Sequence, residues 1–227
     1  ILPLTSLREI NSAASHLSEN LASAVKKRFD VELRQSYGMI ETSCISVPEY
    51  GDTRTYSVGK IQPGTEVKLI DETGQQVGLG ERGEMCVKGL NVMKRWLNDS
   101  ESCVDEDGFF HTGDIVTYEK DGTITIVDRI KDIIKVKGYQ VSPLELENII
   151  INNKKILDVA VIGIEDERKG EVPKAFIVKE KNVNLTKHDV IDFVKGKVES
   201  FKNIVDVEFV NTIPKSPMGK ILRRELK

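Results

Sequence analysis

Hydrophobic and polar residues change their spacing along the chain, and each spacing predicts a different element. Near the start, Leu21, Val25 and Phe29 recur at helical spacing around Ala22, and Ser18 stands where a helix N-cap is expected. We therefore expect a helix that begins after Ser18.

The spacing then changes to that of strands. Residues 31–37 predict a short strand, and residues 58–127 alternate in short runs that turn residues separate. These runs read GTEVKLIDETGQQVG, GEMCVKG and DIVTYEKDGTITIVD. The Asp121-Gly122 pair between two alternating runs predicts a hairpin. We expect an antiparallel sheet or a small barrel in this region.

The pattern changes again after Arg129. Ser142 is followed by Pro143 and Glu145, the arrangement of a capping box with proline at the first helical position. The buried stripe of this helix is expected to contain Leu146, Ile149 and Ile150.

The rest of the chain alternates strands with a second capped helix. The strands are expected in ILDVAVIGI, KAFIVKE and VDVEFV, and Thr186 with Asp189 is expected to cap the helix. That helix is expected to carry Val190, Phe193, Val194 and Val198. This is a compact α+β unit of roughly a hundred residues, a size that can hold its own core. We place its boundary near residues 128–132.

Composition excludes several classes of protein. The 227 residues are 39% hydrophobic and 30% charged, which is typical of a globular protein. No apolar run approaches the ~18 residues of a membrane span. The net charge of -3 provides no overall basic field that would attract nucleic acid. We expect no membrane span and no nucleic-acid partner.

The cysteines predict a reducing compartment. Cys44, Cys86 and Cys103 are an odd, widely spaced set without a CxxC pair, so neither a disulfide framework nor a zinc site is indicated. We expect an intracellular protein. The chain opens ILPLTSLREI, without Met or a signal-like layout, and we expect it to be part of a longer protein.

A first candidate for chemistry is QSYGMIETS, residues 35–43. Glycine lets the backbone approach a ligand, an aromatic ring can cover a flat base, and a glutamate suits Mg²⁺ held against phosphate oxygens. An ordinary strand-end turn with a surface glutamate has the same pattern, and this alternative stays open.

A second candidate is HTGD, residues 111–114. Asp114 is expected at a strand start, where a carboxylate can accept hydrogen bonds from both ribose hydroxyls. A turn-capping aspartate is equally compatible with the sequence. His111 is interpreted as a packed or solvated residue, because HTGD is not a metal-binding motif.

The third and fourth candidates are basic. Lys131, Lys135 and Lys137 lie in DRIKDIIKVKGYQVSP, which could also be a solvated face. Lys220 lies in PKSPMGKILRR, which is no P-loop, because Pro214 stands in place of a glycine and Ile221 in place of Ser or Thr. A mobile, solvated tail is one interpretation of this segment. A lysine delivered to a charged intermediate is the other.

In this order, YGMIE, GEMCVKG, HTGD, VDRIKDIIKVKGYQVSPLELE and PKSPMGKILRR resemble the adenylate-forming superfamily. The resemblance is strongest to acyl-CoA synthetases close to coumarate:CoA ligases and beetle luciferases, and it covers essentially the whole chain. It implies that ATP activates a carboxylic acid to an acyl-adenylate, which then acylates coenzyme A. The implied cofactors are ATP, Mg²⁺ and coenzyme A.

The resemblance also implies a domain layout. Residues 1–129 would be the end of a large α/β domain, with a β-barrel-like antiparallel subdomain over residues 58–127. Residues 130–227 would be a small, mobile α+β domain with a hinge near residues 129–132. The overall fold class is therefore expected to be mixed α+β.

A role is implied for each matching position of the large domain. Glu41 would hold Mg²⁺, and Asp114 with Arg129 would bind the ribose. The remaining nucleotide-binding positions are expected to be Ala13, Ala14, Gln35, Ser36, Tyr37, Gly38 and Ile40.

The small domain would supply lysines. Lys131 would lie at the hinge, Lys135 would approach the nucleotide, and Lys137 with Gly138 would face coenzyme A. Alternation along one strand would place Lys135 and Lys137 on the same face. Lys220 would be the catalytic lysine of adenylation, because a positioned cation stabilises the charge on the attacking carboxylate and the α-phosphate.

The chain departs from the family pattern in three places. Ile40 stands where the family has threonine, and Ser12 and Ser15 replace glycine and proline of the small-residue loop. No SGTTG-like phosphate loop occurs in these residues, so we expect the 227 residues alone to be inactive.

Two other functions stay open on these grounds. One is a non-catalytic binding or interaction homologue, and the other is an adenylating relative that uses another acceptor or oxidises the acyl group. The location would be cytoplasmic or peroxisomal. The sequence predicts neither the acid nor the oligomeric state.

Overall fold

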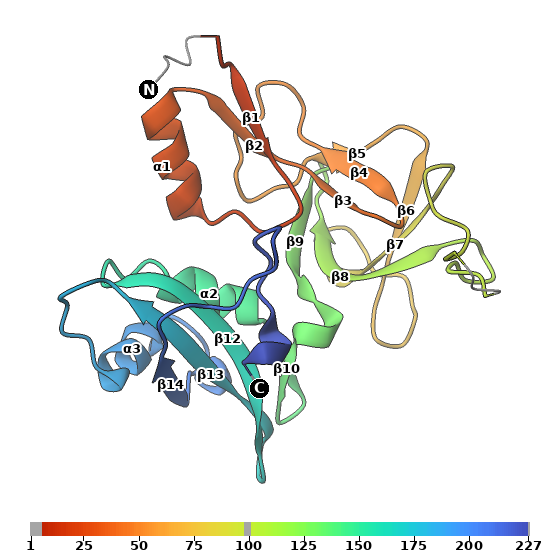
Figure 1. The fold of residues 1–227 in the computed structure, drawn as a ribbon. Coiled ribbons are helices and arrows are strands. Elements are labelled where there is room, and N and C mark those ends of the chain that lie inside the picture. Colours follow the sequence, from red (N-terminus) through yellow and green to blue (C-terminus); the bar gives the residue numbers. More distant parts are fainter. Residues whose placement is uncertain (1–5, 98–100, 227) are drawn as a thin grey trace. The chain divides into compact units, whose positions relative to one another are not determined.

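The computed structural model of the chain describes residues 6–97 and 101–226 (Figure 1). The chain divides into two compact units, Ile1–Val127 and Asp128–Lys227, and each is described by itself. Both units combine sheet with helix, so the mixed α+β class is confirmed. Whether the second unit moves about a hinge at residues 129–132 stays a prediction.

Unit 1 contains one helix and mostly short strands. In chain order these are β1 (Glu9–Ser12), α1 (Glu19–Phe29), β2 (Glu32–Gln35), β3 (Tyr37–Met39), β4 (Ser43–Val47), β5 (Lys60–Ile61), β6 (Thr65–Ile70), β7 (Arg82–Gly89), β8 (Phe110–Tyr118) and β9 (Ile124–Arg129), whose last two residues belong to unit 2.

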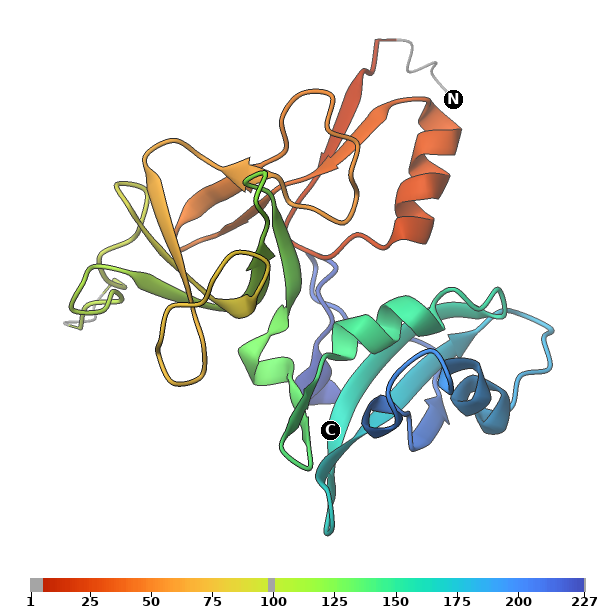
Figure 2. The same ribbon diagram turned by 180° about the vertical axis from the view of Figure 1, so that it is seen from behind.

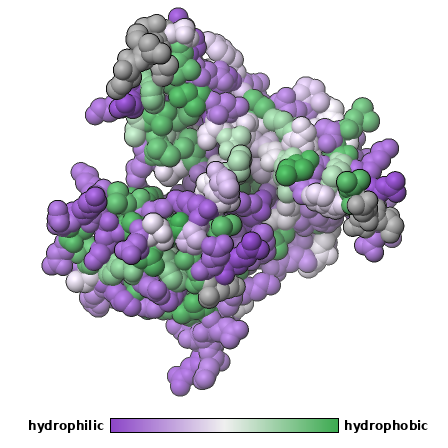
Figure 3. Space-filling model, in the orientation of Figure 1, coloured by the Kyte–Doolittle hydropathy of each residue, from purple (hydrophilic) through white to green (hydrophobic). Residues whose placement is uncertain are grey.

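Helix α1 begins as predicted, but its packed face differs from the expected stripe. Ser18 is the N-cap and accepts a hydrogen bond from the Leu21 N–H. Ala22 is buried against Leu17 and Leu33, whereas Leu21 is 54% exposed and Phe29 is also exposed. Hydrophobic surface is visible in this part of unit 1 in Figure 3. The reason is that the described partner of α1, the two-stranded parallel sheet β1-β2, covers one side of the helix.

The remainder of unit 1 is antiparallel sheet. Strands β6-β7-β8-β9 form one sheet, and β3-β4-β5 form a second. The predicted Asp121-Gly122 hairpin is confirmed between β8 and β9, with Gly122 at φ 85°. Residues of both sheets pack into one hydrophobic core. Its buried members are Tyr37, Ile45, Val58, Leu69, Met85, Val87, Val116 and Ile124. The sheet predicted over residues 58–127 therefore shares its core with β3 and β4.

Unit 2 contains two capped helices and a five-stranded sheet. Its elements are η1 (Ile130–Asp132), β10 (Ile134–Val136), β11 (Tyr139–Val141), α2 (Pro143–Ile150), β12 (Ile156–Asp166), β13 (Gly170–Lys179), α3 (Lys187–Val194), η2 (Ser200–Lys202), β14 (Asp206–Phe209) and η3 (Arg223–Glu225).

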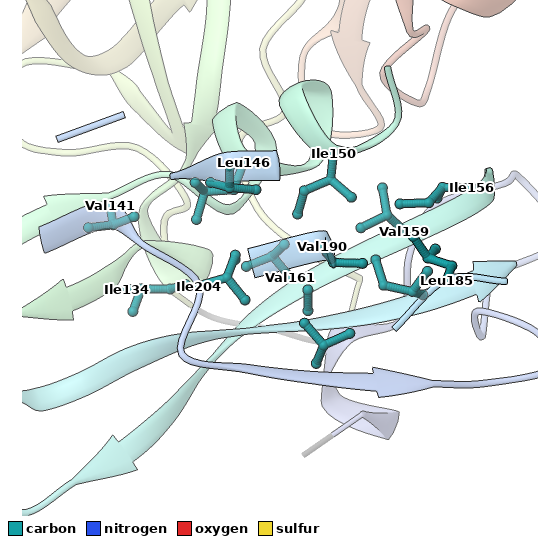
Figure 4. Close-up of a cluster of buried hydrophobic side chains, with 14 of the residues drawn as sticks. Ile134, Val141, Leu146, Ile150, Ile156, Val159, Val161, Leu185, Val190 and Ile204 are labelled. Atoms are coloured by element: carbon teal, nitrogen blue, oxygen red, sulfur yellow. The ribbon is translucent and has the colours of Figure 1, made fainter. Parts of the chain in front are cut away.

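The sheet of unit 2 is covered on both faces. Its order is β11-β10-β13-β12, and β14 pairs in parallel with β13. Because side chains alternate along a strand, Val159 and Val161 of β12 point to the face covered by α2 and α3 (Figures 2 and 4). Ala160 and Ile162 point to the other face, where Ile213 of the C-terminal segment packs. The C-terminal segment is therefore one layer of the unit.

The helix caps of unit 2 agree with the sequence, with one correction. Thr186 and Asp189 form the predicted capping box, but α3 ends at Val194, so Val198 is not helical. Lys195, at ψ 130°, ends the helix, and Gly196, at φ 82°, lies in the turn that follows. Val198 still packs against the core. Ser142 caps α2 as expected.

Glu145 takes part in the N-cap of α2 through its backbone, because its N–H donates to Ser142 Oγ at 3.1 Å. Its carboxylate accepts hydrogen bonds of 2.8 and 3.1 Å from Lys202. The predicted stripe of α2 contains two fully buried residues, Leu146 and Ile150, and the half-buried Ile149. Among the described residues, no helix has the length and apolar character that crossing a membrane requires.

Candidate active site

Asp114 is a buried carboxylate on β8. It is 2% exposed, and its Oδ2 accepts a hydrogen bond of 2.5 Å from the Tyr37 hydroxyl. Its backbone N–H donates to Thr112 Oγ1 at 3.1 Å, and the Thr112 hydroxyl donates to the Met85 carbonyl at 2.7 Å. Strand β8 thus holds the backbone of Asp114 in place, while the carboxylate meets a neutral phenol on β3.

A β-bulge sets this position on β8. Glu84 pairs with Ile115, and Cys86 pairs with His111. These two pairs are two residues apart on β7 but four residues apart on β8, so β8 bulges between them. Gly113 lies in the bulge at φ 68°, a conformation that glycine adopts without strain. The glycine of HTGD therefore shapes the strand beside Asp114.

The residues predicted to border an adenine are held by the fold. Gln35 is buried, its Oε1 accepts the Leu17 N–H at 3.1 Å, and its Nε2 donates to the Thr55 carbonyl. Ser36 donates its N–H to the Ser12 carbonyl at 3.0 Å. The amide of Gln35 is bonded at both ends within unit 1, and its role beside an adenine stays a prediction.

The fold itself requires a glycine at position 38, which the sequence did not indicate. A Cβ at this position would lie 2.2 Å from the Ser43 carbonyl oxygen and 2.9 Å from Cys44 Cα. Close pairing of β3 with β4 therefore requires glycine here, independently of any ligand.

The turn between β3 and β4 carries the predicted Mg²⁺ ligand. The Glu41 carbonyl accepts the Met93 N–H at 2.7 Å, and the Thr42 carbonyl accepts Asn91 Nδ2 at 2.7 Å. Ile40, in the same turn, is 88% exposed. The turn is thus held through its backbone carbonyls. A single carboxylate on a held turn fits an ion that takes its other ligands from water and phosphate, as Mg²⁺ does.

The small-residue segment follows β1. Ala13 and Ala14 are both exposed, and Ala14 has φ 72° in the left-handed region that non-glycine residues rarely adopt. This strained turn keeps two small side chains at the end of β1, and their predicted place beside a nucleotide is untested.

Arg129 ends β9 and belongs to unit 2. Its N–H donates to Asp128 Oδ1 at 2.7 Å. Asp128 is buried, and its Oδ2 accepts the Ser142 hydroxyl and the Leu144 N–H. Asp128 therefore joins the end of β9 to the start of α2. Asp114 and Arg129 lie in different units, so their shared role at one ribose stays a prediction.

The three lysines of the basic run occupy three different local structures. Lys131 is exposed in η1, and Lys135 is exposed in the centre of β10, where its N–H donates to Glu171 Oε2 at 2.9 Å. Lys137 and Gly138 have φ of 50° and 84° and form the turn across which Val136 pairs with Tyr139. Two consecutive positive φ values are typical of a type I′ hairpin turn.

The expectation that Lys135 and Lys137 share one face of a strand is therefore wrong, because β10 ends at Val136. Nothing lies within 4 Å of a Cβ built on Gly138, so the positive φ explains this glycine better than close packing does. Lys137 extends from a turn, where the strand alternation does not apply.

Lys220 lies on a hydrogen-bonded turn, which corrects the interpretation of its segment as a mobile tail. The Ser216 N–H donates to the Lys220 carbonyl at 2.8 Å, the Lys220 N–H donates to Ser216 Oγ at 3.2 Å, and Lys215 pairs with Ile221. Gly219, at φ 80°, permits the turn. On the same turn, Lys215 Nζ lies 2.5 Å from Asp158 Oδ2 of β12.

Arg223 holds the same segment from its other end. Its guanidinium donates to both carboxylate oxygens of Glu147 on α2, one of them at 3.0 Å, and to the Val161 carbonyl at 2.8 Å. Its Nε lies 3.5 Å from Asp132 Oδ2. Burial raises the pKa of the Glu147 carboxyl, and Arg223 opposes that rise. Sequence reasoning missed this ion pair, and the two adjacent arginines in ILRREL are the only local signal.

Comparisons with known proteins agree with these motifs. A family model described as AMP-binding enzyme matches residues 2–97, and one described as AMP-binding enzyme C-terminal domain matches residues 145–220.

Curated relatives match nearly the whole chain. A 4-coumarate:CoA ligase of Petunia hybrida is 40% identical over 99% of this chain and 43% of its own length. Luciferin 4-monooxygenase of Photinus pyralis is 39% identical over 99% of this chain and 42% of its own length. The chain therefore spans about two fifths of the length of these relatives.

Solved structures share the fold. ATP-bound MatB from Rhodopseudomonas palustris has a TM-score of 0.90 and 29% identity, with 95% of this chain and 44% of that chain covered. The anthranilate CoA ligase AuaEII, in complex with anthranoyl-AMP, has a TM-score of 0.87 and 30% identity, with 98% and 44% covered. The chain belongs to the AMP-binding, or adenylate-forming, enzyme family.

Proposed function

We propose that this chain is part of an acid–CoA ligase, which activates a carboxylic acid with ATP to an acyl-adenylate and transfers the acyl group to coenzyme A. The observation that carries the proposal is the 40% identity to a 4-coumarate:CoA ligase, which extends over both units and includes the segments of Glu41, Asp114 and Lys220. The substrate would be a small acyl or aryl acid.

Unit 1 would bind the nucleotide. The Asp114 carboxylate, fixed on β8, would accept hydrogen bonds from the ribose hydroxyls. Glu41 would hold Mg²⁺ against the phosphates. The small side chains of Ala13 and Ala14 would leave room at the nucleotide, with Gln35, Ser36 and Tyr37 near the base.

Unit 2 would supply cations, one for each half-reaction. Lys220 would stabilise the charge that collects on the attacking carboxylate and the α-phosphate during adenylation. The turn that carries it is bonded at Ser216 and anchored by Arg223, so the cation would be held with little freedom. Lys137 and Gly138 would face coenzyme A in the second half-reaction, Lys135 would approach the nucleotide, and Lys131 and Arg129 would lie near the hinge.

The 227 residues contain no SGTTG-like loop of the kind that holds a triphosphate through backbone N–H groups. We therefore expect the chain alone not to support efficient adenylation, and tests of activity and of nucleotide affinity use the longer protein that we propose contains it. Three free cysteines fit an intracellular location, cytoplasmic or peroxisomal.

Changing Lys220 to Ala tests the proposal. We expect ATP-dependent pyrophosphate release to fall about 10²- to 10³-fold, because one preorganised donor to the developing charge is lost. Thioester formation from supplied acyl-adenylate should be almost unchanged. Lys215→Ala, on the same turn, is the matched control and should keep most of the pyrophosphate release. Equal losses in both half-reactions of Lys220→Ala would reject the assignment.

A second candidate function is transfer to another acceptor or oxidation of the acyl group, which the 39% identity to luciferin 4-monooxygenase favours. Pyrophosphate release from a panel of acids, with and without coenzyme A, distinguishes the two. Release without a coenzyme A thioester would favour the second candidate. No release with any acid would indicate a non-catalytic homologue.

A further inference from the structure

We propose that Glu84, Cys86 and His111 bind a divalent transition-metal ion of the zinc type, at a site separate from the predicted Mg²⁺ ligand. Their ligand atoms all lie within 4.8 Å of one another. All three residues belong to unit 1. The proposal does not depend on the ligase activity.

The strand register brings these residues together. Glu84 and Cys86 are two positions apart on β7 and so share one face of the strand. His111 on β8 is the direct partner of Cys86. The bulge in β8 separates this pair from the next one, Glu84 with Ile115. The spacing in the sequence gives no metal-binding motif, because the site depends on the pairing of two strands.

The distances suit a small tetrahedral ion. His111 Nδ1 lies 3.6 Å from Cys86 Sγ and 3.1 Å from Glu84 Oε2. Zinc bonds of about 2.0 Å to nitrogen and oxygen and about 2.3 Å to sulfur place neighbouring tetrahedral ligands roughly 3.3–3.6 Å apart. The two distances from His111 Nδ1 are therefore close to those of a tetrahedral site, and a water molecule can be its fourth ligand.

Outer contacts orient two of the three ligands. His111 Nε2 lies 3.4 Å from Asp105 Oδ2, the arrangement in which a metal-bound histidine donates its other N–H to a carboxylate. The second oxygen of Glu84, Oε1, accepts the Gly113 N–H at 3.1 Å, which leaves Oε2 directed at His111. These contacts fix the orientation of His111 and Glu84 as outer contacts do in metal sites.

Charge and access also favour a cation. The carboxylates of Glu84 and Asp105 face His111. Two lysines lie nearby: Lys68 is 3.5 Å from Asp105 Oδ2 and above the Phe109 ring, and Lys88 is 5.4 Å from the centroid of the same ring. The His111 side chain is 44% exposed, which provides a path for the ion from solvent.

Cys86 would supply the sulfur ligand from inside the unit. Its side chain is fully buried. A coordinated thiol gives up its proton, so the ion would bind Cys86 as the thiolate.

One backbone hydrogen bond connects the proposed metal site to the strand that carries the predicted nucleotide ligand Asp114. Glu84 bonds the N–H of Gly113, the residue before Asp114. A bound ion would hold Glu84 and so restrict the bulge that positions Asp114. This offers a route by which metal loading could influence nucleotide affinity.

Cobalt titration of the 227-residue chain tests the proposal, because Co²⁺ reports thiolate ligation by its charge-transfer absorption. We expect one ion per chain, a thiolate-to-cobalt band, and displacement of Co²⁺ by Zn²⁺. Cys86→Ala should abolish the band. Cys44→Ser and Cys103→Ser are the matched controls and should retain it. Absence of the band in the unchanged chain, or its persistence in Cys86→Ala, would overturn the proposal.

Two further variants keep the test decisive if Cys86→Ala fails to fold. His111→Gln changes an exposed side chain, and should weaken Co²⁺ binding by at least tenfold. Asp105→Asn should weaken it by about 10- to 100-fold while the thiolate band remains. Affinity equal to that of the unchanged chain in His111→Gln would contradict the site.

Discussion

Each unit contains a deeply buried carboxylate, and the two are held in different ways. Glu147 of unit 2 meets the Arg223 guanidinium with both oxygens and accepts the Val161 N–H at 2.7 Å. Asp114 of unit 1 meets the neutral Tyr37 hydroxyl. The first carboxylate is neutralised by a cation of its own unit, and the second is positioned by its strand.

This difference suggests different roles. An ion pair between α2 and the C-terminal segment is suited to hold the layer that carries Lys220, because a broken buried pair leaves an uncompensated charge. A carboxylate whose backbone is fixed by its strand is suited to accept hydrogen bonds from a ligand. We therefore propose that Glu147 serves the fold and that Asp114 serves the nucleotide.

The largest expected effect on stability comes from Arg223→Ala. This change leaves Glu147 buried without its cation, and we expect a loss of about 3–5 kcal/mol in the free energy of unfolding. Urea denaturation of the 227-residue chain measures it. The adjacent, exposed Arg224 provides the matched control, and Arg224→Ala should change stability by about 0.5 kcal/mol or less. Equal effects of the two variants would show that the ion pair is not what holds the segment.

The smallest expected effect comes from Ile40→Thr, which restores the residue that the family has at this position. Ile40 is 88% exposed, so the change should alter the free energy of unfolding by no more than about 0.5 kcal/mol. Any change in the KM for ATP would then report on the phosphate contact and not on folding. A stability loss above 1.5 kcal/mol, on the order of a buried substitution, would contradict the exposed position of this side chain.

Local patterns predicted the elements well where the signal itself is local. Ser18, Ser142 and Thr186 cap helices as expected, and Asp121-Gly122 forms the hairpin. Each prediction depends on a few consecutive residues whose backbone preferences agree.

The errors arose where tertiary pairing decides the outcome. Lys137 lies in a turn and not on a strand, because the pairing of Val136 with Tyr139 ends β10 one residue earlier. The packed face of α1 depends on which side the two-stranded sheet covers. The Arg223–Glu147 pair joins residues that are 76 positions apart.

In the candidate site, too, the sequence indicated single residues but not their tertiary partners. Motif resemblance indicated Asp114 and Lys220, but not that Tyr37 donates to Asp114 or that Ser216 holds the Lys220 turn. No sequence motif indicated the cluster of Glu84, Cys86 and His111, because strand register brings His111 to the other two residues.

One matched pair of amide substitutions tests the central assignment most directly. Nucleotide affinity in the longer protein and the free energy of unfolding of the chain are to be measured for Asp114→Asn and Glu147→Gln. We predict that Asp114→Asn weakens nucleotide binding about 10- to 100-fold, since hydrogen bonds to a charged group are worth about 1.5–3 kcal/mol, and that it costs little stability. We predict that Glu147→Gln costs several kcal/mol of stability, roughly 3–5, and leaves nucleotide affinity of the folded protein unchanged. Undiminished nucleotide affinity in Asp114→Asn, or unchanged stability in Glu147→Gln, would contradict the account.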